Sequence, residues 1–178
     1  MLSMSTIALL ALAAIALLLV YAATRPDTFR ITRTKVIKAP ARKLHSMIND
    51  LKSYNSWNPF ERKDPSIKGS YSGPAGGVGA AYAWSGRKVG AGRLEIIDSV
   101  VPNKVTMKLD FAKPFKTQNI AEFTLQAEGD NLTIVSWALH GPAPFISKLI
   151  GVVFNMDRLV GKDLEAGLAD LKALTEAR

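Results

Sequence analysis

The spacing of apolar residues in the last third of the chain indicates one long amphipathic helix. From residue 145 to residue 177 large apolar residues recur at intervals of three and four, which places them on one helical face. The stripe consists of Leu149, Val152, Val153, Met156, Val160, Leu164, Leu168, Leu171 and Leu174. Such a face must pack against other apolar surface. We therefore predict a single continuous helix lying across the elements that precede it.

The middle of the chain has the alternating pattern of strands with one buried face. Turn-forming Gly, Pro, Asn and Asp residues separate the alternating segments. The expected strands cover 29–37, 67–72, 78–84, 89–100, 105–111, 121–125 and 133–139. Clean alternation of this kind is typical of antiparallel sheets with one packed face. The sequence thus predicts an α+β fold in which a curved antiparallel sheet of about seven strands surrounds the long C-terminal helix.

Two short helices are predicted between the first strand and the second. Ala39-Pro40 ends the first strand, and proline suits the first turn of a helix. Residues 41–49 place apolar side chains on one helical face, and a second short helix is expected near 51–54. We expect the segment from Ser56 to Phe60 to break this helix and to begin an extended stretch. The two helices would close one end of the curved sheet.

The N-terminal segment is predicted to be a membrane anchor. Residues 1–24 carry no charged side chain, and 7–23 is apolar apart from Tyr21. About 20 apolar residues suffice to cross a bilayer as a transmembrane helix. The alternative is a cleaved signal peptide with Val20-Tyr21-Ala22 at its cleavage site. The expected organisation is an anchor at 1–24, a linker at 25–28 and a folded domain at 29–178.

The chain has a formal net charge of +8, and basic residues gather just after the apolar segment. They are Arg25, Arg30, Arg33, Lys35, Lys38, Arg42 and Lys43, with Asp27 as the one acid among them. The positive-inside bias predicts a cytoplasmic domain, with export as the alternative. The cluster either contacts an anionic membrane surface or forms a solvated strand edge. It does not interleave with aromatics in a nucleic-acid-binding motif, so no nucleic-acid partner is expected.

The order of elements and three short motifs resemble a known superfamily. The motifs are Val36-Ile37-Lys38-Ala39-Pro40, Ser53-Tyr54-Asn55-Ser56-Trp57-Asn58-Pro59, and Tyr71-Ser72-Gly73-Pro74 followed by Gly76-Gly77-Val78-Gly79. They resemble the START/Bet v 1-like superfamily (SRPBCC), and within it the polyketide cyclase/dehydrase and lipid-transport group. The resemblance covers roughly 29–174. It implies a helix-grip fold with a hydrophobic cavity between sheet and helix, whose occupants in the superfamily include lipids, sterols, polyketides and plant hormones.

A cavity for a small hydrophobic ligand is therefore expected between the sheet and the helix. The candidate lining residues are Trp57, Tyr82, Trp84, Phe111, Ala121, Phe123, Trp137, Met156, Val160, Asp163 and Gly167. Small residues at inward positions, Ala121 and Gly167, indicate room beside the aromatics, because glycine inside a helix costs about 1 kcal/mol. Polar atoms on a mostly apolar wall suit such ligands. Ordinary core packing is the alternative for any one of these residues.

No catalytic, metal or cofactor site is predicted. His45 and His140 are the two histidines and there is no cysteine, which gives too few ligands for a metal site and no evident nucleophile with its base. Some members of the superfamily catalyse cyclisation. An enzyme of the cyclase/dehydratase type, using Asp163, Glu95 or Tyr82 with a shifted pKa, is therefore the alternative function. A third is an interaction module whose cavity is filled.

Overall fold

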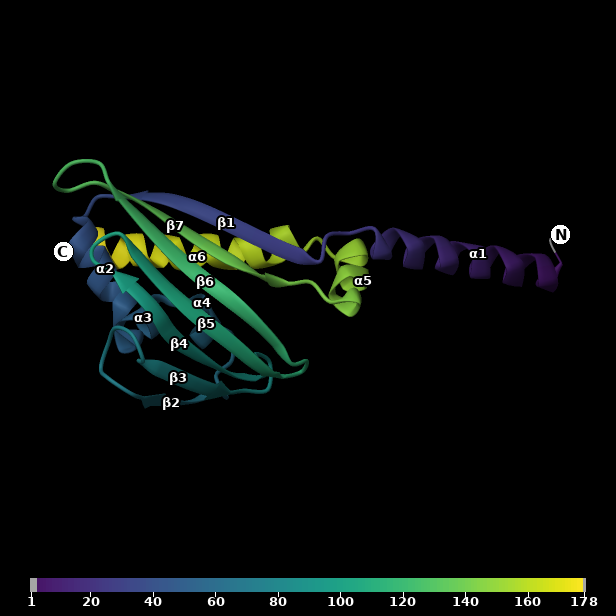
Figure 1. Cartoon of the computed structure of the whole chain (residues 1–178), viewed down its shortest axis with the longest axis horizontal. Helices are drawn as coiled ribbons and strands as arrows, with labels where there is room; N and C mark the ends of the chain where they lie inside the picture. Colours follow the sequence, from purple (N-terminus) through teal and green to yellow (C-terminus); the bar gives the residue numbers. More distant parts are fainter. Residues whose placement is uncertain (1–2, 178) are drawn as a thin grey trace.

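The computed structural model describes residues 3–177, apart from the side chain of Val153. An apolar helix leads into a sheet-and-helix domain, and it extends away from that domain (Figure 1). The elements are α1 (Met4–Ala23), β1 (Thr28–Ile37), α2 (Ala41–Asn49), α3 (Leu51–Trp57), α4 (Pro59–Lys63), β2 (Lys68–Ser72), β3 (Ala81–Ser85), β4 (Ala91–Val100), β5 (Lys104–Lys113), β6 (Thr117–Ala127), β7 (Thr133–Pro142), α5 (Phe145–Val153) and α6 (Met156–Glu176).

The seven strands form one antiparallel sheet in the order β1-β7-β6-β5-β4-β3-β2. β1 lies at one edge and pairs with β7, so the first and last strands are neighbours. α6 runs along the sheet, and α2, α3 and α4 close the space at its side (Figure 1). The predicted α+β helix-grip fold is confirmed, including the strand number and the N-terminal apolar helix.

The core lies between the inner face of the sheet and α6. Leu164, Leu168 and Leu171 of α6 are fully buried against strand residues such as Val135 and Phe123. These leucines belong to the predicted stripe, and each buried leucine contributes about 1.5–3 kcal/mol before ordering costs. The alternation predicted for β1 also holds, because its buried residues Ile31 and Ile37 share one face with the inward side of the sheet.

The single helix predicted for 145–177 is wrong, because the structure contains two helices. α5 ends at Val153, and Phe154 and Asn155 have extended backbone conformations. The Asn155 side chain accepts a hydrogen bond from the backbone N–H of Arg158 at 2.9 Å and caps the start of α6. Asparagine followed by an acid in the first turn is a strong helix-start signal. The continuous apolar stripe outweighed this signal in the prediction. Met156 at the start of α6 and Leu174 near its end are exposed.

A third short helix replaces the extended segment expected after Ser56. The Asn58 side chain accepts a hydrogen bond from the backbone N–H of Phe60 at 3.2 Å, and Pro59 occupies the first helical position. This is the usual chemistry of a helix start, so the Asn-Pro pair begins α4 instead of ending helical structure.

Most of the basic residues after α1 do not gather at the end of α1. β1 carries them away from the end of α1, over about 33 Å at 3.3 Å per residue. Arg30 pairs with Glu122 across the sheet at 3.0 Å. Arg33 contacts Asp157 at 3.0 Å and Glu165 at 2.6 Å, and so fastens the start of α6 to the edge strand. Lys43 donates to the Thr175 carbonyl at 3.1 Å, near the end of α6.

Gly167 permits close contact between α6 and the sheet, and the room expected beside it is filled. A Cβ atom placed on Gly167 would lie 2.7 Å from the ring of Trp137 and 3.0 Å from Pro59 Cδ. The helix-interior cost of glycine is therefore offset by close packing of an indole ring. Gly151 in α5 differs, since a Cβ atom there would meet nothing within 4 Å.

We predict that Gly167→Ala destabilises the protein whereas Gly151→Ala does not. Alanine improves helix propensity by about 1 kcal/mol at both sites. At Gly167 this gain is outweighed by overpacking against Trp137, which typically costs about 1–3 kcal/mol. Denaturant unfolding of the two variants beside the parent measures the difference. Equal stabilisation of both variants would show that α6 can move away from the sheet at no cost.

Candidate functional site

A cavity of about 110 Å³ lies between the inner face of the sheet and the helices. Its wall is mostly aliphatic and aromatic, with a few polar side chains. The lining residues are Tyr54, Asn55, Asn58, Phe60, Glu61, Ile67, Tyr82, Trp84, Val89, Leu94, Leu109, Phe111, Ala121, Trp137, Leu139 and Leu164. An apolar pocket with a small number of polar groups is the usual form of a small-molecule site.

The topology places this cavity toward one end of the sheet. Leu109 and Phe111 lie near the end of β5, Leu139 near the end of β7, and Trp84 near the end of β3. Because neighbouring strands are antiparallel, these positions gather at the same end as the β5–β6 hairpin and the start of α5. The rings of Trp84 and Phe111 meet edge to face, with centroids 5.6 Å apart. Both rings also border a shallow depression on the outer surface, so this pair separates the cavity from solvent.

Polar atoms in the cavity come mainly from the helical side and from β3. Tyr82 is buried on β3, and its hydroxyl lies against Gly69 of the edge strand β2. Burial and the nearby Glu61 carboxylate both raise the pKa of the Tyr82 phenol, so it is a protonated hydrogen-bond donor at neutral pH. Burial likewise raises the pKa of Tyr54. The indole N–H of Trp137 is buried and has no hydrogen-bond partner among residues 3–177.

One side of the cavity is held in place by the carboxylate of Asp64. It accepts hydrogen bonds from the Ser66 hydroxyl at 2.6 Å, from the Ser66 N–H at 3.0 Å and from the Lys88 N–H at 2.6 Å. A longer bond of 3.3 Å comes from the N–H of Val89, which lines the cavity. These bonds join the loop after α4 to the β3–β4 turn. The Ser66 hydroxyl and then the backbone N–H groups hold the pKa of Asp64 well below its usual range.

Five of the eleven predicted ligand-binding residues line the cavity: Tyr82, Trp84, Phe111, Ala121 and Trp137. All five are on strands, where alternation identifies the inward face. The structure places two more of the predicted aromatics, Trp57 and Phe123, in a filled cluster beside the cavity. There the rings of Trp57 and Phe123 lie 6.0 Å apart and Phe123 stacks on Trp137 at 4.8 Å. Trp57 and Phe123 therefore pack against the cavity-lining residue Trp137 without lining the cavity themselves.

The four predicted helical residues do not line the cavity. Met156 is exposed, and Val160 packs against the core beyond the cavity. Asp163 forms an ion pair with Lys63 of α4 at 2.5 Å, and Gly167 contacts Trp137. α6 contributes Leu164 instead. The apolar periodicity identified which face of α6 is buried. It did not identify which turn of α6 lies over the cavity.

Sequence reasoning missed the helical wall of the site, which includes Tyr54, Asn58, Phe60 and Glu61. These residues belong to α3, to the Asn58 cap and to α4. The signal that could have found them was the Asn-Pro pair that starts α4. Once α4 is recognised, Phe60 and Glu61 follow in its first turn.

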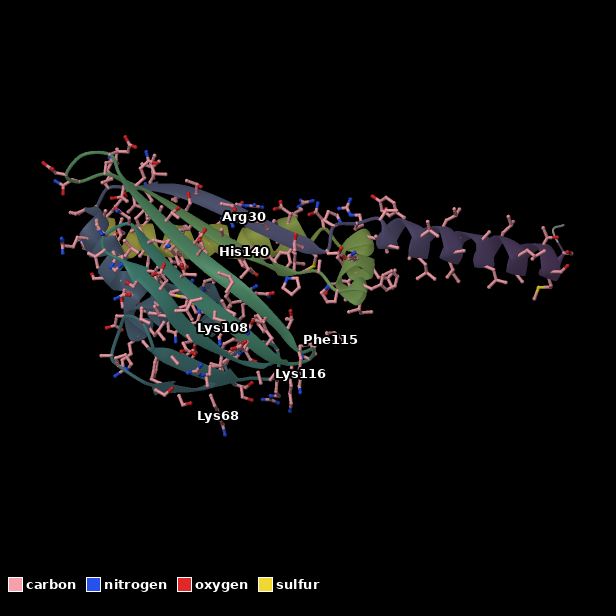
Figure 2. The ribbon with its side chains drawn as sticks, viewed as in Figure 1. Arg30, Lys68, Lys108, Phe115, Lys116 and His140 are labelled. Atoms are coloured by element: carbon pink, nitrogen blue, oxygen red, sulfur yellow. The ribbon has the colours of Figure 1, made fainter. Side chains whose placement is uncertain are left out.

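The histidines are separate from the cavity. His45 is buried in α2, where its Nε2 lies 3.2 Å from the Ser99 hydroxyl, which in turn donates to Asn49 at 2.8 Å. Burial lowers the pKa of His45. His140 is near the end of β7, and Figure 2 shows it on the sheet with Arg30 and Lys108. Among residues 3–177 no group of three His, Asp or Glu side chains is arranged to hold a metal ion.

The sequence of residues 28–176 matches a family described as polyketide cyclase / dehydrase and lipid transport. The chain belongs to this family. The match spans every strand of the sheet and all of the helices from α2 to α6, so the START/Bet v 1-like (SRPBCC) resemblance is confirmed. A search among curated proteins found no match to this sequence.

Solved structures share the fold at low sequence identity. Protein CV1439 from Chromobacterium violaceum is 17% identical, with a TM-score of 0.58 over 85% of this chain and 99% of that one. Major latex-like protein 151 from Panax ginseng is 15% identical, with a TM-score of 0.57 over 84% of this chain and 99% of that one. CalU16 from Micromonospora echinospora is 18% identical, with a TM-score of 0.53 over 82% and 73%. α1 precedes the region matched by the family.

We predict that Asp64→Asn destabilises the protein at neutral pH and that this difference shrinks in acid. A carboxyl whose pKa is lowered by folding stabilises the fold above its unfolded pKa, near 3.9, and the contribution is lost as pH falls through the lower folded value. The gap between parent and variant should therefore be constant above about pH 5 and narrow below about pH 4.

Free energies of unfolding measured across this pH range test the prediction. Asp130→Asn is the matched control, because Asp130 is exposed in the β6–β7 turn and should show little effect at any pH. A pH-independent gap for Asp64→Asn would mean that the charge of Asp64 contributes nothing to holding the loop.

Proposed function

We propose that this protein is a membrane-anchored binding protein for a small hydrophobic ligand, with the cavity under the sheet as its site. The supporting observation is a mostly apolar cavity whose wall includes Tyr82, Glu61 and Trp137. The indole N–H of Trp137 is buried and has no hydrogen-bond partner among residues 3–177. The family description, which includes lipid transport, supports the ligand class.

The ligand must enlarge the cavity when it binds. At about 110 Å³ the space is below the roughly 150 Å³ of an engineered cavity that holds benzene, and well below the ~300–1,000 Å³ of typical ligand pockets. α4 is the element best suited to move. It has five residues, and ion pairs of Arg62 with Asp170 and of Lys63 with Asp163 fasten it to α6. Partly exposed ion pairs contribute only about 0–1 kcal/mol each, so the packing of Pro59 and Phe60 is the main resistance to moving α4.

The polar atoms set the chemistry expected of the ligand. The Trp137 indole N–H and the protonated Tyr82 phenol are donors, while the Glu61 carboxylate is an acceptor. A mostly apolar molecule with one or two oxygen atoms, such as a hydroxylated or carbonyl-bearing lipid or polyketide, satisfies these groups. Burying the Trp137 N–H without a partner costs about 1–3 kcal/mol, which such a ligand recovers.

Binding is favoured over catalysis by the position of the acid–base candidates. Asp163 pairs with Lys63, and Glu95 pairs with Arg93, and neither carboxylate lines the cavity. Tyr82 is the one candidate that does, and its raised pKa makes it a poor acid and keeps it a hydrogen-bond donor. A cyclase or dehydratase needs a positioned acid and base of suitable pKa.

We predict that Ala121→Leu abolishes binding of an apolar probe at little cost in stability. Ala121 lies on β6 opposite Met107 and Leu139 and faces the cavity, so three added carbons fill existing space. Ala80→Leu is the matched control, because Ala80 is equally buried but does not line the cavity. Overpacking there should cost about 1–3 kcal/mol and leave probe binding intact in the folded fraction.

The measurement uses energy transfer from tryptophan to a dansylated fatty acid, together with thermal unfolding. A fragment of residues 25–178 avoids competition from lipid or detergent. We expect it to fold, because α1 contacts the domain chiefly through α5. If the parent fragment folds but never binds an apolar probe, the ligand-binding proposal fails.

For the location, we propose that α1 spans a membrane and that the domain is cytoplasmic. α1 is 20 residues long, apolar and almost wholly exposed, which is unlike a soluble core helix. Length and composition also fit a signal sequence, so the processing of the N-terminus distinguishes the two. The basic residues that follow α1 in sequence favour the cytoplasmic side.

We predict that a fluorescent-protein fusion at the C-terminus is active in cells, whereas an alkaline phosphatase fusion at the same point is inactive. The phosphatase needs an oxidising compartment for its disulfides, and the positive-inside bias keeps the domain out of one. Membrane fractionation and N-terminal sequencing of the fusions complete the test. An active phosphatase, or a mature chain that begins near Ala23, would contradict the assignment.

A further inference from the structure

We propose that α5 and the tip of the β5–β6 hairpin form a second membrane-contact surface, which lies on the bilayer that α1 spans. The membrane-contact face consists of Phe115, Phe145, Ile146, Ile150 and Phe154. It holds the cavity end of the domain against the lipid. The inference rests on the proposed membrane location of α1 and adds to it the orientation of the domain.

The membrane-contact face exposes large apolar side chains that a water-facing surface has no reason to gather. Phe115 is 61% exposed and Phe154 is 58% exposed. Phe145 and Ile146 are each 48% exposed, and Ile150 is 37% exposed. Single exposed apolar residues are ordinary, but four on one nine-residue helix and its C-cap indicate an interaction surface.

The geometry of α5 relative to α1 fits a helix lying in the plane of a membrane. α5 packs against α1, near the end of α1 that enters the domain. Figure 1 shows α5 running crosswise to α1, whereas α6 follows the direction of α1. When α1 crosses the bilayer, α5 therefore lies along its surface. This is the position of amphipathic interfacial helices, whose apolar side enters the boundary between headgroups and acyl chains.

Two contacts fix this arrangement at the base of α1. The Lys148 ammonium of α5 lies 2.6 Å from the Asp27 carboxylate in the linker. The backbone N–H of Ala143, just before α5, donates to the Asp27 carbonyl at 2.7 Å. The end of the linker and the start of α5 thus move as one unit, and α5 cannot swing away from Asp27 without breaking both contacts.

The hairpin tip adds an aromatic and basic contact from a distant part of the sequence. Figure 2 shows Phe115 and Lys116 at the end of the sheet that faces the same side as α5. Lys113 and Lys116 flank Phe115 and are exposed, and Arg25 is exposed at the end of α1. Aromatic side chains beside lysine and arginine are typical of the interface of an anionic leaflet.

The bilayer is the occupant that these observations favour over a second copy of the chain or another protein. α5, which carries most of the membrane-contact face, packs against the apolar helix α1. The two parts of the face, α5 and the hairpin tip, come from distant parts of the sequence and share the end of the domain from which α1 extends. That suits the surface of the bilayer that α1 enters. The same end of the sheet carries the cavity, which places the cavity close to the lipid in this arrangement.

The absence of cysteine from the sequence makes the test direct. Single cysteines are placed in the full-length chain by Leu12→Cys, Phe115→Cys, Ile150→Cys and Lys68→Cys, and each is labelled with the fluorophore NBD. Leu12 is the marker in α1, and Lys68 is an exposed control on β2, away from α5 (Figure 2). The labelled proteins are reconstituted in phosphatidylcholine vesicles containing phosphatidylglycerol, with doxyl quenchers placed shallow or deep in the acyl chains.

The inference predicts shallow quenching at 115 and 150, deep quenching at 12 and none at 68. Shallow doxyl groups should quench more strongly at both contact sites, because interfacial residues insert only about 5–10 Å. Deep quenching at 12 with positions 115 and 150 as unquenched as 68 would overturn the contact surface and leave the membrane span intact. A blue-shifted but unquenched label at 150 would show that this face packs against a second copy of the chain and would also overturn the inference. Absence of quenching at 12 would refute the membrane location, and the inference with it.

Discussion

The contact between Gly167 and the Trp137 ring fixes the distance between α6 and the sheet, and the rest of the domain depends on that distance. Trp137 lies on β7, whose neighbours are β1 and β6. One side of its ring stacks on Phe123 in a filled aromatic cluster, and the residue also lines the cavity. Pro59 lies beside the same glycine, so the start of α4 is positioned by the same close approach. A larger residue on α6 would move the helix, the aromatic cluster and α4 together, because close-packed interiors transmit such displacements.

Most of the architecture could be predicted from the sequence, because it depends on periodicities that residues display locally. Alternation identified the strands and their inward faces, and the three-and-four spacing identified the buried face of α6. The break at Phe154 and the extra helix α4 were missed for one shared reason. Both depend on an asparagine that caps a helix, at Asn155 and at Asn58. In a prediction of helix boundaries, a single capping residue is a weaker signal than a long apolar stripe. The capping residue nevertheless determines where the hydrogen-bonded turns begin.

The candidate site was predictable on its sheet side and not on its helical side. A strand residue has two possible directions, so Tyr82, Phe111 and Ala121 could be assigned to the cavity from alternation alone. The direction of a helix side chain depends on rotation about the helix axis, and its position along that axis depends on where the helix starts. The start of α6 was predicted incorrectly, so the positions of its residues along the sheet were also incorrect. The basic residues show the same limit of prediction. Arg33 and Lys43 are close to α1 in sequence, yet Arg33 contacts Asp157 at the start of α6 and Lys43 contacts Thr175 near its end. Sequence distance from the apolar segment does not give distance from the surface of a membrane.

The linker between α1 and β1 is only four residues long, from Thr24 to Asp27, and it is fastened at both of its ends. Thr24 still hydrogen-bonds to the last turn of α1, and Asp27 is bonded to the segment that starts α5. A domain on so short a tether cannot turn over or reach across an aqueous gap. If α1 spans a bilayer and the domain binds a ligand as proposed, the domain cannot carry that ligand from one membrane to another. It can diffuse only within its own membrane, so a soluble or membrane-bound acceptor would have to come to it.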